Sequence, residues 1–419
     1  MDSIILDPTE NPLDDAYVPY VTRRHVPHAA HRCFHKEVDA EGICWLTFDT
    51  PDSPANVWNS ETLDELDCHI EDLHHDSSVR AVVIRSAKER IYIAGADLRA
   101  VRSLGPDKLK ELLVLGQDVF THLESLRIPK VAAIHGACLG GGYEMALACD
   151  WRVASDDEIT RIGLPETQLG LIPAWGGSTR LPRLIGVPRA LDLIVRGKTL
   201  KARAAKRAGL IHEITSHEHL DGLARKFALQ KTRVRHHHFH FTQVWPAPHL
   251  IRLKARAELL AKFPWMKNVP AAPLAAVDVV TRGASRSFEQ SLALEQEVIG
   301  TLATSPASRS FIDAFLRKES ASRKVPAALA RVEPRPVAHA AVIGAGVMGS
   351  GIAYALAAKG LRVVLTDSAP DLVARGLERI EGFLTEGVKR HAFTRKEASD
   401  VRDRIAPTHE SVPLAGVDL

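Results

Sequence analysis

The chain alternates short apolar runs with longer stretches in which apolar residues recur every three or four positions. The runs at residues 43–48, 81–86 and 131–136 are rich in β-branched, aromatic or small apolar residues and are typical of buried strands. A helical pattern with Ser60 as its expected N-cap follows the first run, and residues 107–124 form an amphipathic helical pattern before the third. Strands that alternate with helices in this way predict an α/β layered core.

The pattern changes along the chain and divides it into four parts. Prolines without periodicity mark an irregular beginning, a basic and histidine-rich stretch follows the first strand–helix alternation, and a new strand–helix pattern starts near Ala340. We therefore expect an N-terminal extension (1–33), a first α/β domain (34–224), a connector with linker helices (225–336) and a second α/β unit (337–419).

The composition is that of an ordinary globular protein and narrows the classes of partner. The 419 residues are 45% hydrophobic and 25% charged, and the net charge of +3 gives no reason to expect nucleic acid or an anionic membrane as a partner. No apolar run approaches the roughly 18 residues that a membrane helix needs, and we find no secretory leader. The five cysteines show no CxxC spacing, so we expect free thiols, no metal centre and a cytoplasmic location. The histidines within residues 236–240 are more typical of a solvated connector than of a metal site.

Three segments bring together residues suited to acyl chemistry: 93–98 (IAGADL), 135–150 (HGACLGGGYEMALACD) and 163–181 (GLPETQLGLIPAWGGSTRL). In the second segment an apolar strand runs into three consecutive glycines and then a helical stretch from Tyr143, so helix N-terminal N–H groups are free to face a ligand. In the first segment, nothing bulky shields the N–H of Ala96. Two N–H groups from separate loops predict an oxyanion hole for a thioester carbonyl.

Glu144, at the start of that helix, and Glu166, in a loop after Pro165, are candidate proton-transfer groups. Adding water to a double bond needs one proton taken from water and one given to carbon, and two carboxyl groups in different environments can divide these roles. Each feature alone has a structural explanation: three glycines usually make a tight turn, a lone glutamate complements the helix dipole, and Asp97 suits a turn. Their occurrence together, in this order, favours a catalytic site.

These segments resemble the signature segments of the crotonase (enoyl-CoA hydratase/isomerase) superfamily, over roughly residues 36–215. The resemblance implies an α/β fold built as a spiral of ββα units and an acyl-CoA thioester substrate. It also implies that Ala96 and Gly141 supply the oxyanion-hole N–H groups and that Glu144 and Glu166 are the two catalytic glutamates of a hydratase. In that case 2-enoyl-CoA gains water without a cofactor, and we expect Glu166 to activate the water with Glu144 as its partner.

Two other functions stay open. A Δ3–Δ2 enoyl-CoA isomerase of the same fold would shift a double bond with one carboxylate, and the presence of both glutamates favours hydration instead. A non-catalytic CoA-binding subunit of a β-oxidation complex would bind the thioester without turnover. Substitution of Glu144 and Glu166 by glutamine separates this second alternative from an enzyme.

A second motif begins near residue 341, where an apolar strand leads into Gly344, Gly346 and Gly349 and a helix follows. A further strand then ends in Asp367. This order is the context of a dinucleotide-binding fingerprint, in which glycines admit the pyrophosphate, the helix N-terminus meets its charge and the acidic residue bonds the ribose hydroxyls. The expected cofactor of this segment is NAD rather than NADP.

The segment resembles the opening of the 3-hydroxyacyl-CoA dehydrogenase domain, and the whole order resembles the N-terminal part of the multifunctional fatty-acid β-oxidation enzyme. The resemblance implies that the chain forms a homo-oligomer or binds a thiolase. Residues 337–419 amount to about half of a Rossmann domain, and LAGVDL at their end is typical of the start of a further strand. We therefore expect a helical linker followed by a truncated Rossmann unit, with NAD binding possible and dehydrogenase activity only in a longer form.

Overall fold

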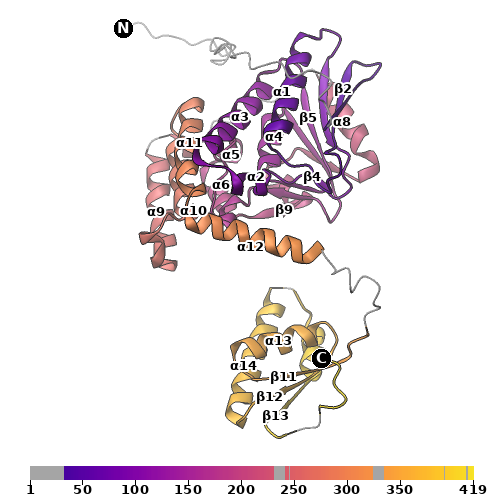
Figure 1. Cartoon of the computed structure of the whole chain (residues 1–419), viewed down its shortest axis with the longest axis vertical. Coiled ribbons are helices and arrows are strands. Elements are labelled where there is room, and N and C mark those ends of the chain that lie inside the picture. Colours follow the sequence, from indigo (N-terminus) through magenta and orange to yellow (C-terminus); the bar gives the residue numbers. More distant parts are fainter. Residues whose placement is uncertain (1–32, 231–240, 245, 324–334, 391, 412–413) are drawn as a thin grey trace. The chain divides into compact units, whose positions relative to one another are not determined.

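The computed structural model describes residues 33–230, 241–244, 246–323, 335–390, 392–411 and 414–419. The expected N-terminal extension except Cys33, the histidine run and residues 324–334 of the expected connector lie outside the described residues. Contacts between residues divide the chain after Arg323 into two units (Figure 1). The linker helices therefore group with the first unit, while the domain boundaries expected from the sequence stay predictions.

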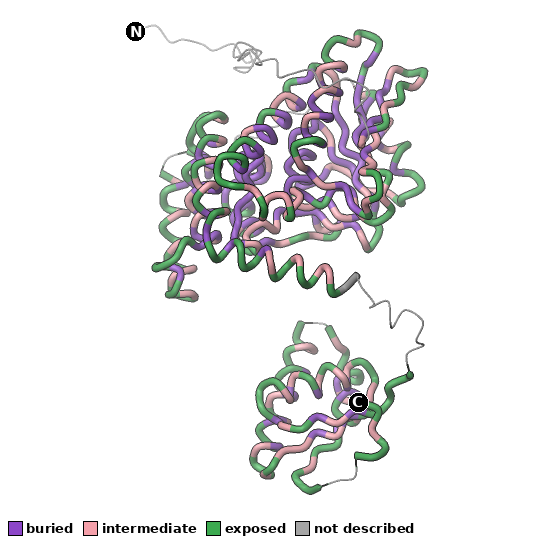
Figure 2. The backbone as a smooth tube through the Cα atoms, in the orientation of Figure 1, coloured by how far each residue is buried: buried purple, intermediate pink, exposed green. Residues whose placement is uncertain are grey.

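A six-stranded sheet forms the centre of the first unit. Its strands are β1 (Phe34–Val38), β2 (Ile43–Phe48), β3 (Ala81–Ser86), β5 (Lys130–Ile134), β7 (Trp151–Ser155) and β10 (Glu213–Thr215). They lie in this order across the sheet, with β1 and β2 antiparallel and all other neighbours parallel. The apolar runs at 43–48 and 81–86 are confirmed as strands, and the third run forms β5. Figure 2 shows that these strands are largely buried, as continuous apolar runs in a parallel sheet require.

A second, smaller sheet lies in the same unit. It contains β4 (Ile91–Ile93), β6 (Ala137–Leu139), β8 (Arg161–Gly163) and β9 (Thr199–Lys201), with β9 antiparallel to β8 and the rest parallel. The strands β3, β5 and β7 are each followed by one short strand of this sheet and then by a helix or helical turn. This repeated strand–strand–helix order is the ββα spiral that the sequence predicts.

Eight α-helices complete the alternating part of the unit: α1 (Ser60–His75), α2 (Leu98–Ser103), α3 (Pro106–Ser125), α4 (Gly141–Ala148), α5 (Gly177–Ile185), α6 (Val187–Val195), α7 (Ala202–Ala208) and α8 (Leu220–Ala228). Two expected helix starts were wrong. Asn59, not Ser60, caps α1, because the Asn59 side chain accepts a hydrogen bond from the Thr62 N–H and Thr62 closes the capping box. Helix α4 begins at Gly141, two residues before Tyr143, because the glycine turn itself has helical backbone from its second residue.

Four further helices pack onto this core: α9 (Ala247–Lys262), α10 (Ala272–Gly283), α11 (Phe288–Ala303) and α12 (Pro306–Arg323). Helix α10 contacts α5 and α6, α11 contacts α3 and α5, and α12 contacts α2 and the short helix η2 (Glu166–Leu169). Three other single turns are η3 (His217–His219), η4 (Phe241–Gln243) and η5 (Pro264–Asn268). Apolar residues of α10, α11 and α12 belong to the same hydrophobic core as the sheet, so these helices are part of the first unit.

The second unit is a small α/β layer with its own core. Its strands β11 (His339–Ile343), β12 (Arg362–Thr366) and β13 (Ile405–Thr408) are parallel, and its helices are α13 (Val347–Ala358), α14 (Pro370–Lys389) and α15 (Arg395–Asp403). The last residues pair with the free edge of β11, since Ala341 N–H donates to Leu419 O (2.9 Å) and Asp418 N–H to His339 O (2.9 Å). The final residues therefore lie along the edge of this sheet, but they form no assigned strand where the sequence predicts the start of one.

Candidate active site

Two glycine-containing loops meet at the amino end of α4. Gly140 has a left-handed backbone angle (φ 53°) and turns the chain from β6 into the helix. A Cβ on Gly142 would stand 2.3 Å from Ile93 O, and a Cβ on Gly95 (φ 96°) would stand 3.3 Å from the Gly141 nitrogen. Only glycine fits these contacts. The segments around residues 95 and 141 are therefore in direct contact.

The N–H groups of Ala96 and Gly141 are available at this junction. Trp58 pairs with the residues on either side of Ala96, because Trp58 N–H donates to Gly95 O and Asp97 N–H donates to Trp58 O, both at 2.8 Å. Gly141 is the first residue of α4, where an N–H has no partner within the helix. Within the described parts of the chain, neither the Ala96 nor the Gly141 N–H donates a hydrogen bond. The structure thus places the two expected oxyanion-hole donors on adjoining loops.

The Trp58 side chain also fixes the second of these loops. Its indole Nε1 donates to Gly141 O at 3.1 Å. Asp97, expected to be a turn residue, caps α2 by accepting hydrogen bonds from Arg99 N–H and Ala100 N–H. The peptide that carries the Ala96 N–H is held through its carbonyl, Gly95 O, and the peptide that carries the Gly141 N–H is held through Gly140 O, which accepts hydrogen bonds from Tyr143 N–H and Glu144 N–H.

Glu144 lies on α4 with its side chain turned into the protein rather than toward solvent. It is 2% exposed, and its Oε1 accepts hydrogen bonds from Trp175 N–H and Gly177 N–H, each at 2.8 Å. Burial raises the pKa of Glu144 to about 7, although these two donors oppose the rise. A surface role at a helix start is excluded for this residue.

Glu166 begins η2 and presents a buried carboxyl group without hydrogen-bond partners. Both of its carboxyl oxygens are inaccessible, and neither has a partner among the described residues. A Cβ on Gly140 would stand 3.0 Å from Glu166 Oε1, so the carboxyl group lies against the glycine turn. Burial raises the pKa of Glu166 well above its usual value, and the charge of Glu144 raises it further. The two glutamates are therefore close enough to interact, and both lie beside the glycine junction.

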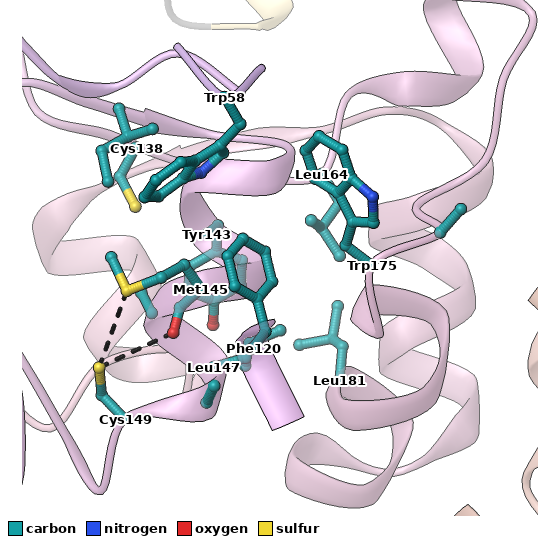
Figure 3. Close-up of a cluster of buried hydrophobic side chains, with 14 of the residues drawn as sticks. Trp58, Phe120, Cys138, Tyr143, Met145, Leu147, Cys149, Leu164, Trp175 and Leu181 are labelled. Atoms are coloured by element: carbon teal, nitrogen blue, oxygen red, sulfur yellow. Dashed lines mark hydrogen bonds between the residues drawn. The ribbon is translucent and has the colours of Figure 1, made fainter. Parts of the chain in front are cut away.

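Aromatic rings form a wall next to the junction. Trp58 and Phe120 pack edge to face with centroids 5.6 Å apart, and Phe120 and Trp175 do so at 5.9 Å (Figure 3). A Cβ on Gly141 would stand 2.6 Å from Trp175 Cε3, so the Trp175 ring covers the candidate oxyanion-hole glycine. Trp175 is 4% exposed and belongs both to the hydrophobic core and to the edge of the site.

Glu295 of α11 is a third buried carboxyl group, which the sequence analysis missed. It is fully buried, and it accepts hydrogen bonds from Gly176 N–H (2.8 Å) and from the Thr179 hydroxyl (2.7 Å). A signal was present in the helical pattern, because Glu295 falls on the stripe that also contains the buried residues Ser291, Ile299 and Leu302. An acidic residue on the apolar stripe of a helix indicates a buried partner.

The second unit holds the four residues of the expected dinucleotide fingerprint in one place. Gly344 has a left-handed backbone (φ 101°), and a Cβ on Gly349 would stand 1.7 Å from Gly344 O, so α13 packs tightly on the turn. Open space surrounds the Cβ direction of Gly346 at the start of α13. Asp367 accepts a hydrogen bond from Ala345 N–H at 2.7 Å, and this bond with a second from Ser368 N–H lowers the pKa of its carboxyl group. The arrangement fits a dinucleotide, with an ionised carboxylate beside an open helix N-terminus.

The described residues contain no group of three or more histidine, cysteine or acidic side chains placed to hold a metal ion. In the same residues, no helix is long and apolar enough to cross a membrane. The histidines at 236–240 lie outside the described residues, so the expectation for them stays a prediction.

Two family models match the chain. The model described as enoyl-CoA hydratase/isomerase matches residues 39–248, and the model described as the NAD-binding domain of 3-hydroxyacyl-CoA dehydrogenase matches residues 339–419. The fatty acid oxidation complex subunit alpha of Shewanella amazonensis is 35% identical over 390 residues, covering 90% of this chain and 54% of that protein. The protein of the same name from Vibrio vulnificus is 35% identical over 358 residues, covering 83% and 49%. The chain spans about half the length of the curated relatives it matches.

A solved structure shares the fold of the first unit. Human mitochondrial delta3-delta2-enoyl-CoA isomerase matches with a TM-score of 0.52 and 24% identity, covering 70% of this chain and 100% of that chain. This likeness supports the fold that the sequence predicts.

Proposed function

Because the chain belongs to the enoyl-CoA hydratase/isomerase family, we propose that its first unit adds water across the double bond of a 2-enoyl-CoA thioester and forms a 3-hydroxyacyl-CoA. The observation that carries this proposal is the Glu166 carboxyl group, which is buried beside the glycine junction and has no hydrogen-bond partner among the described residues. A buried polar group without a partner costs free energy, and such groups are retained where a ligand or substrate supplies the partner.

In the proposed reaction the thioester oxygen accepts hydrogen bonds from the Ala96 and Gly141 N–H groups. These donors stabilise the negative charge that the oxygen gains when water attacks the β-carbon. One glutamate takes a proton from the water as the C–O bond forms. The other gives a proton to the α-carbon, so the elements of water are added in full. One proton then passes between the two glutamates and restores the starting state.

The hydrogen bonds around the pair support a proposed division of the two roles. Two backbone N–H groups stabilise the ionised form of Glu144, whereas the Glu166 carboxyl oxygens have no such donors among the described residues. Glu144 is therefore the carboxylate that accepts the proton of water, and Glu166 is the acid that protonates the α-carbon. This proposal exchanges the roles expected from the sequence, where nothing distinguished the surroundings of the two residues.

Glutamine variants at the two positions test the proposal. We expect Glu144→Gln and Glu166→Gln each to lower kcat for crotonyl-CoA hydration by about 10²–10⁴-fold, the usual contribution of a general acid or base. Binding of saturated butyryl-CoA, measured by calorimetry, should persist in both. Glu158→Gln is the matched control, because Glu158 is an exposed partner of Lys201; its turnover should equal that of the wild type.

Other results of the same assay separate the alternatives. Isomerisation of a 3-enoyl-CoA without loss of crotonyl-CoA would replace hydration by the isomerase function. Binding of butyryl-CoA by a chain that turns over neither substrate would favour the non-catalytic CoA-binding subunit.

The second unit is proposed to hold NAD. Gly346 and the amino end of α13 would face the pyrophosphate, and the Asp367 carboxylate would accept hydrogen bonds from the ribose hydroxyls. When bound, NAD supplies a hydride acceptor for the 3-hydroxyacyl-CoA that the first unit forms. The relatives are named as subunits of a fatty acid oxidation complex, and we propose that this chain also works in an assembly, as a homo-oligomer or with a thiolase. The cytoplasmic location stays a prediction.

A further inference from the structure

Glu295 accepts a hydrogen bond from the same turn whose N–H groups bind Glu144. The turn comprises Trp175, Gly176 and Gly177 and ends at the first residue of α5. Gly176 has a left-handed backbone (φ 100°), and a Cβ there would stand 1.8 Å from an Arg180 side-chain nitrogen. Glycine therefore allows the left-handed turn that directs the three N–H groups toward the carboxyl groups.

The three consecutive N–H groups of this turn are divided between two carboxyl groups. Trp175 N–H and Gly177 N–H donate to Glu144 Oε1, while Gly176 N–H, between them, donates to Glu295 Oε2; all three distances are 2.8 Å. Loss of the middle acceptor would leave a buried N–H unpaired and allow the peptide to rotate. The two outer donors belong to the neighbouring peptides of the same turn, so a rotation of the middle peptide would displace them and Glu144 would lose its position as well.

Other polar groups hold Glu295 itself. Its second oxygen, Oε1, accepts a hydrogen bond from the Thr179 hydroxyl at 2.7 Å, and the Thr179 hydroxyl also bonds the Ser291 hydroxyl at 2.8 Å. Gln117 Nε2 lies 3.4 Å from Oε2. Glu295 is thus fixed from α3, α5 and α11 together.

Several charged groups surround this carboxyl group. From α5, Arg180 and Arg183 face it; Glu124 of α3 pairs with Arg180, and Glu289 lies on α11. Glu144 of α4 and Glu166 of η2 complete the set. Burial, together with the charge of Glu144, raises the pKa of Glu295 to about 8, while Glu295 in turn raises the pKa of Glu166. A carboxyl group that holds its proton at neutral pH can sit beside the catalytic pair without adding a third negative charge.

We propose that Glu295 is a positioning residue for the hydration reaction, contributed by the linker helix α11, which fixes the Trp175–Gly177 turn and through it the hydrogen bonds and charge state of Glu144. The inference rests on the proposed function of the first unit. It gives the helices that follow the ββα core a role in positioning a catalytic group, in addition to their role in packing.

Two variants at position 295 separate positioning from simple packing. In Glu295→Gln an amide oxygen can still accept from Gly176 N–H and the amide nitrogen can donate to Thr179, so kcat for crotonyl-CoA should fall by less than about threefold. In Glu295→Ala the Gly176 N–H loses its acceptor, and kcat should fall by about 10- to 100-fold with KM nearly unchanged, as for a misplaced catalytic group. Glu297→Ala, at an exposed position on the same helix, is the control and should match the wild type.

The pH profile of kcat is a measurement that a purely structural role of Glu295 would leave unchanged. In Glu295→Ala the acid limb should shift to higher pH, because Glu144 loses well-placed N–H donors and its pKa rises. In Glu295→Gln the acid limb should stay. The alkaline limb should shift to lower pH, because above a pH of about 8 the wild-type Glu295 is ionised and raises the pKa of Glu166, whereas the neutral amide does not. Wild-type limbs and kcat in folded Glu295→Ala would overturn the proposal, as would equal losses in both variants without a shift of either limb.

A double-mutant cycle of Glu144→Gln and Glu295→Ala keeps the inference separate from the proposed function. The free energy of unfolding by urea needs no turnover, and residues coupled through one turn give non-additive changes, whereas independent sites give additive ones. Additive changes would overturn the coupling of Glu295 to Glu144. If the wild-type chain does not hydrate crotonyl-CoA, the proposed function is wrong. The double-mutant cycle would still test the coupling of Glu295 to Glu144.

Discussion

Glu144 and Glu166 are two buried carboxyl groups that cannot both ionise cheaply in a water-poor site. Burial opposes ionisation of each, and the charge of one opposes ionisation of the other. The two backbone N–H donors at Glu144 distinguish the two residues, because these donors stabilise the ionised form of Glu144 and not that of Glu166. The proposed hydration needs one base and one acid, and the different surroundings of the two carboxyl groups suit this division.

This electrostatic arrangement predicts a bell-shaped pH profile. Since burial raises the pKa of Glu144 to about 7, kcat/KM for crotonyl-CoA should rise by about tenfold per pH unit below that value as its carboxylate forms. At higher pH, Glu166 loses its proton and the rate should fall. The measurement is kcat/KM from pH 5 to pH 10 in buffers of constant ionic strength. A rate that stays level across this range would contradict the assignment of one base and one acid.

At the scale of elements, helix α3 sets the position of the Trp175 ring. Gly116 lies on α3 against this ring, and a Cβ there would stand 2.4 Å from Trp175 Nε1. The ring in turn covers Gly141. The packing of Gly116 against the Trp175 ring therefore reaches the candidate oxyanion hole.

We expect Gly116→Ala to displace Trp175 and lower both stability and activity. Overpacking a buried contact costs about 1–3 kcal/mol of unfolding free energy, and kcat/KM should fall because the ring no longer covers Gly141. Gly300→Ala is the control, since that glycine is also helical but has open space at its Cβ; it should gain up to about 1 kcal/mol from helix propensity. Urea unfolding and crotonyl-CoA turnover measure both effects. A stabilised and fully active Gly116→Ala would show that the ring moves aside freely.

The elements were predictable where local sequence determines them. The runs ICWLTF and AVVIRS became β2 and β3 with the expected bounds, because a continuous apolar run has few alternatives to a buried strand. The start of α1 was misplaced by one residue, because Asn59 and Ser60 are both good caps and only the partner Thr62 decides between them.

The sequence indicated the residues of the candidate site, but it did not indicate how they are arranged in space. Its glycines and glutamates were found from motifs, but the contact of the Glu166 carboxyl group with Gly140 joins residues that local pattern does not relate. The donors that distinguish Glu144 from Glu166 come from a turn about thirty residues away. Glu295 was missed for the same reason, since its partners lie on other helices.

At the scale of the whole molecule, the chain consists of two units with separate hydrophobic cores. One core spans the sheets and the linker helices, and the other is confined to residues between Val342 and Ile405. The two matched family models divide the chain in the same way. Units with separate cores respond separately to core substitutions, so each proposed activity can be changed without the other.

Gly349→Ala should therefore remove one activity of the intact chain and spare the other. A Cβ at this position would stand 1.7 Å from Gly344 O, which is backbone, so α13 and the glycine turn must move apart and lose the geometry proposed for NAD. We expect the affinity for NADH, measured by calorimetry, to fall by more than about tenfold, while crotonyl-CoA hydration stays at the wild-type rate. Gly351→Ala is the matched control, because it lies on the same helix with open space at its Cβ and should bind NADH as the wild type does. Equal NADH affinity in the two variants, or no NADH binding by the wild-type chain, would contradict the nucleotide site, and a parallel loss of hydration in Gly349→Ala would contradict the independence of the units.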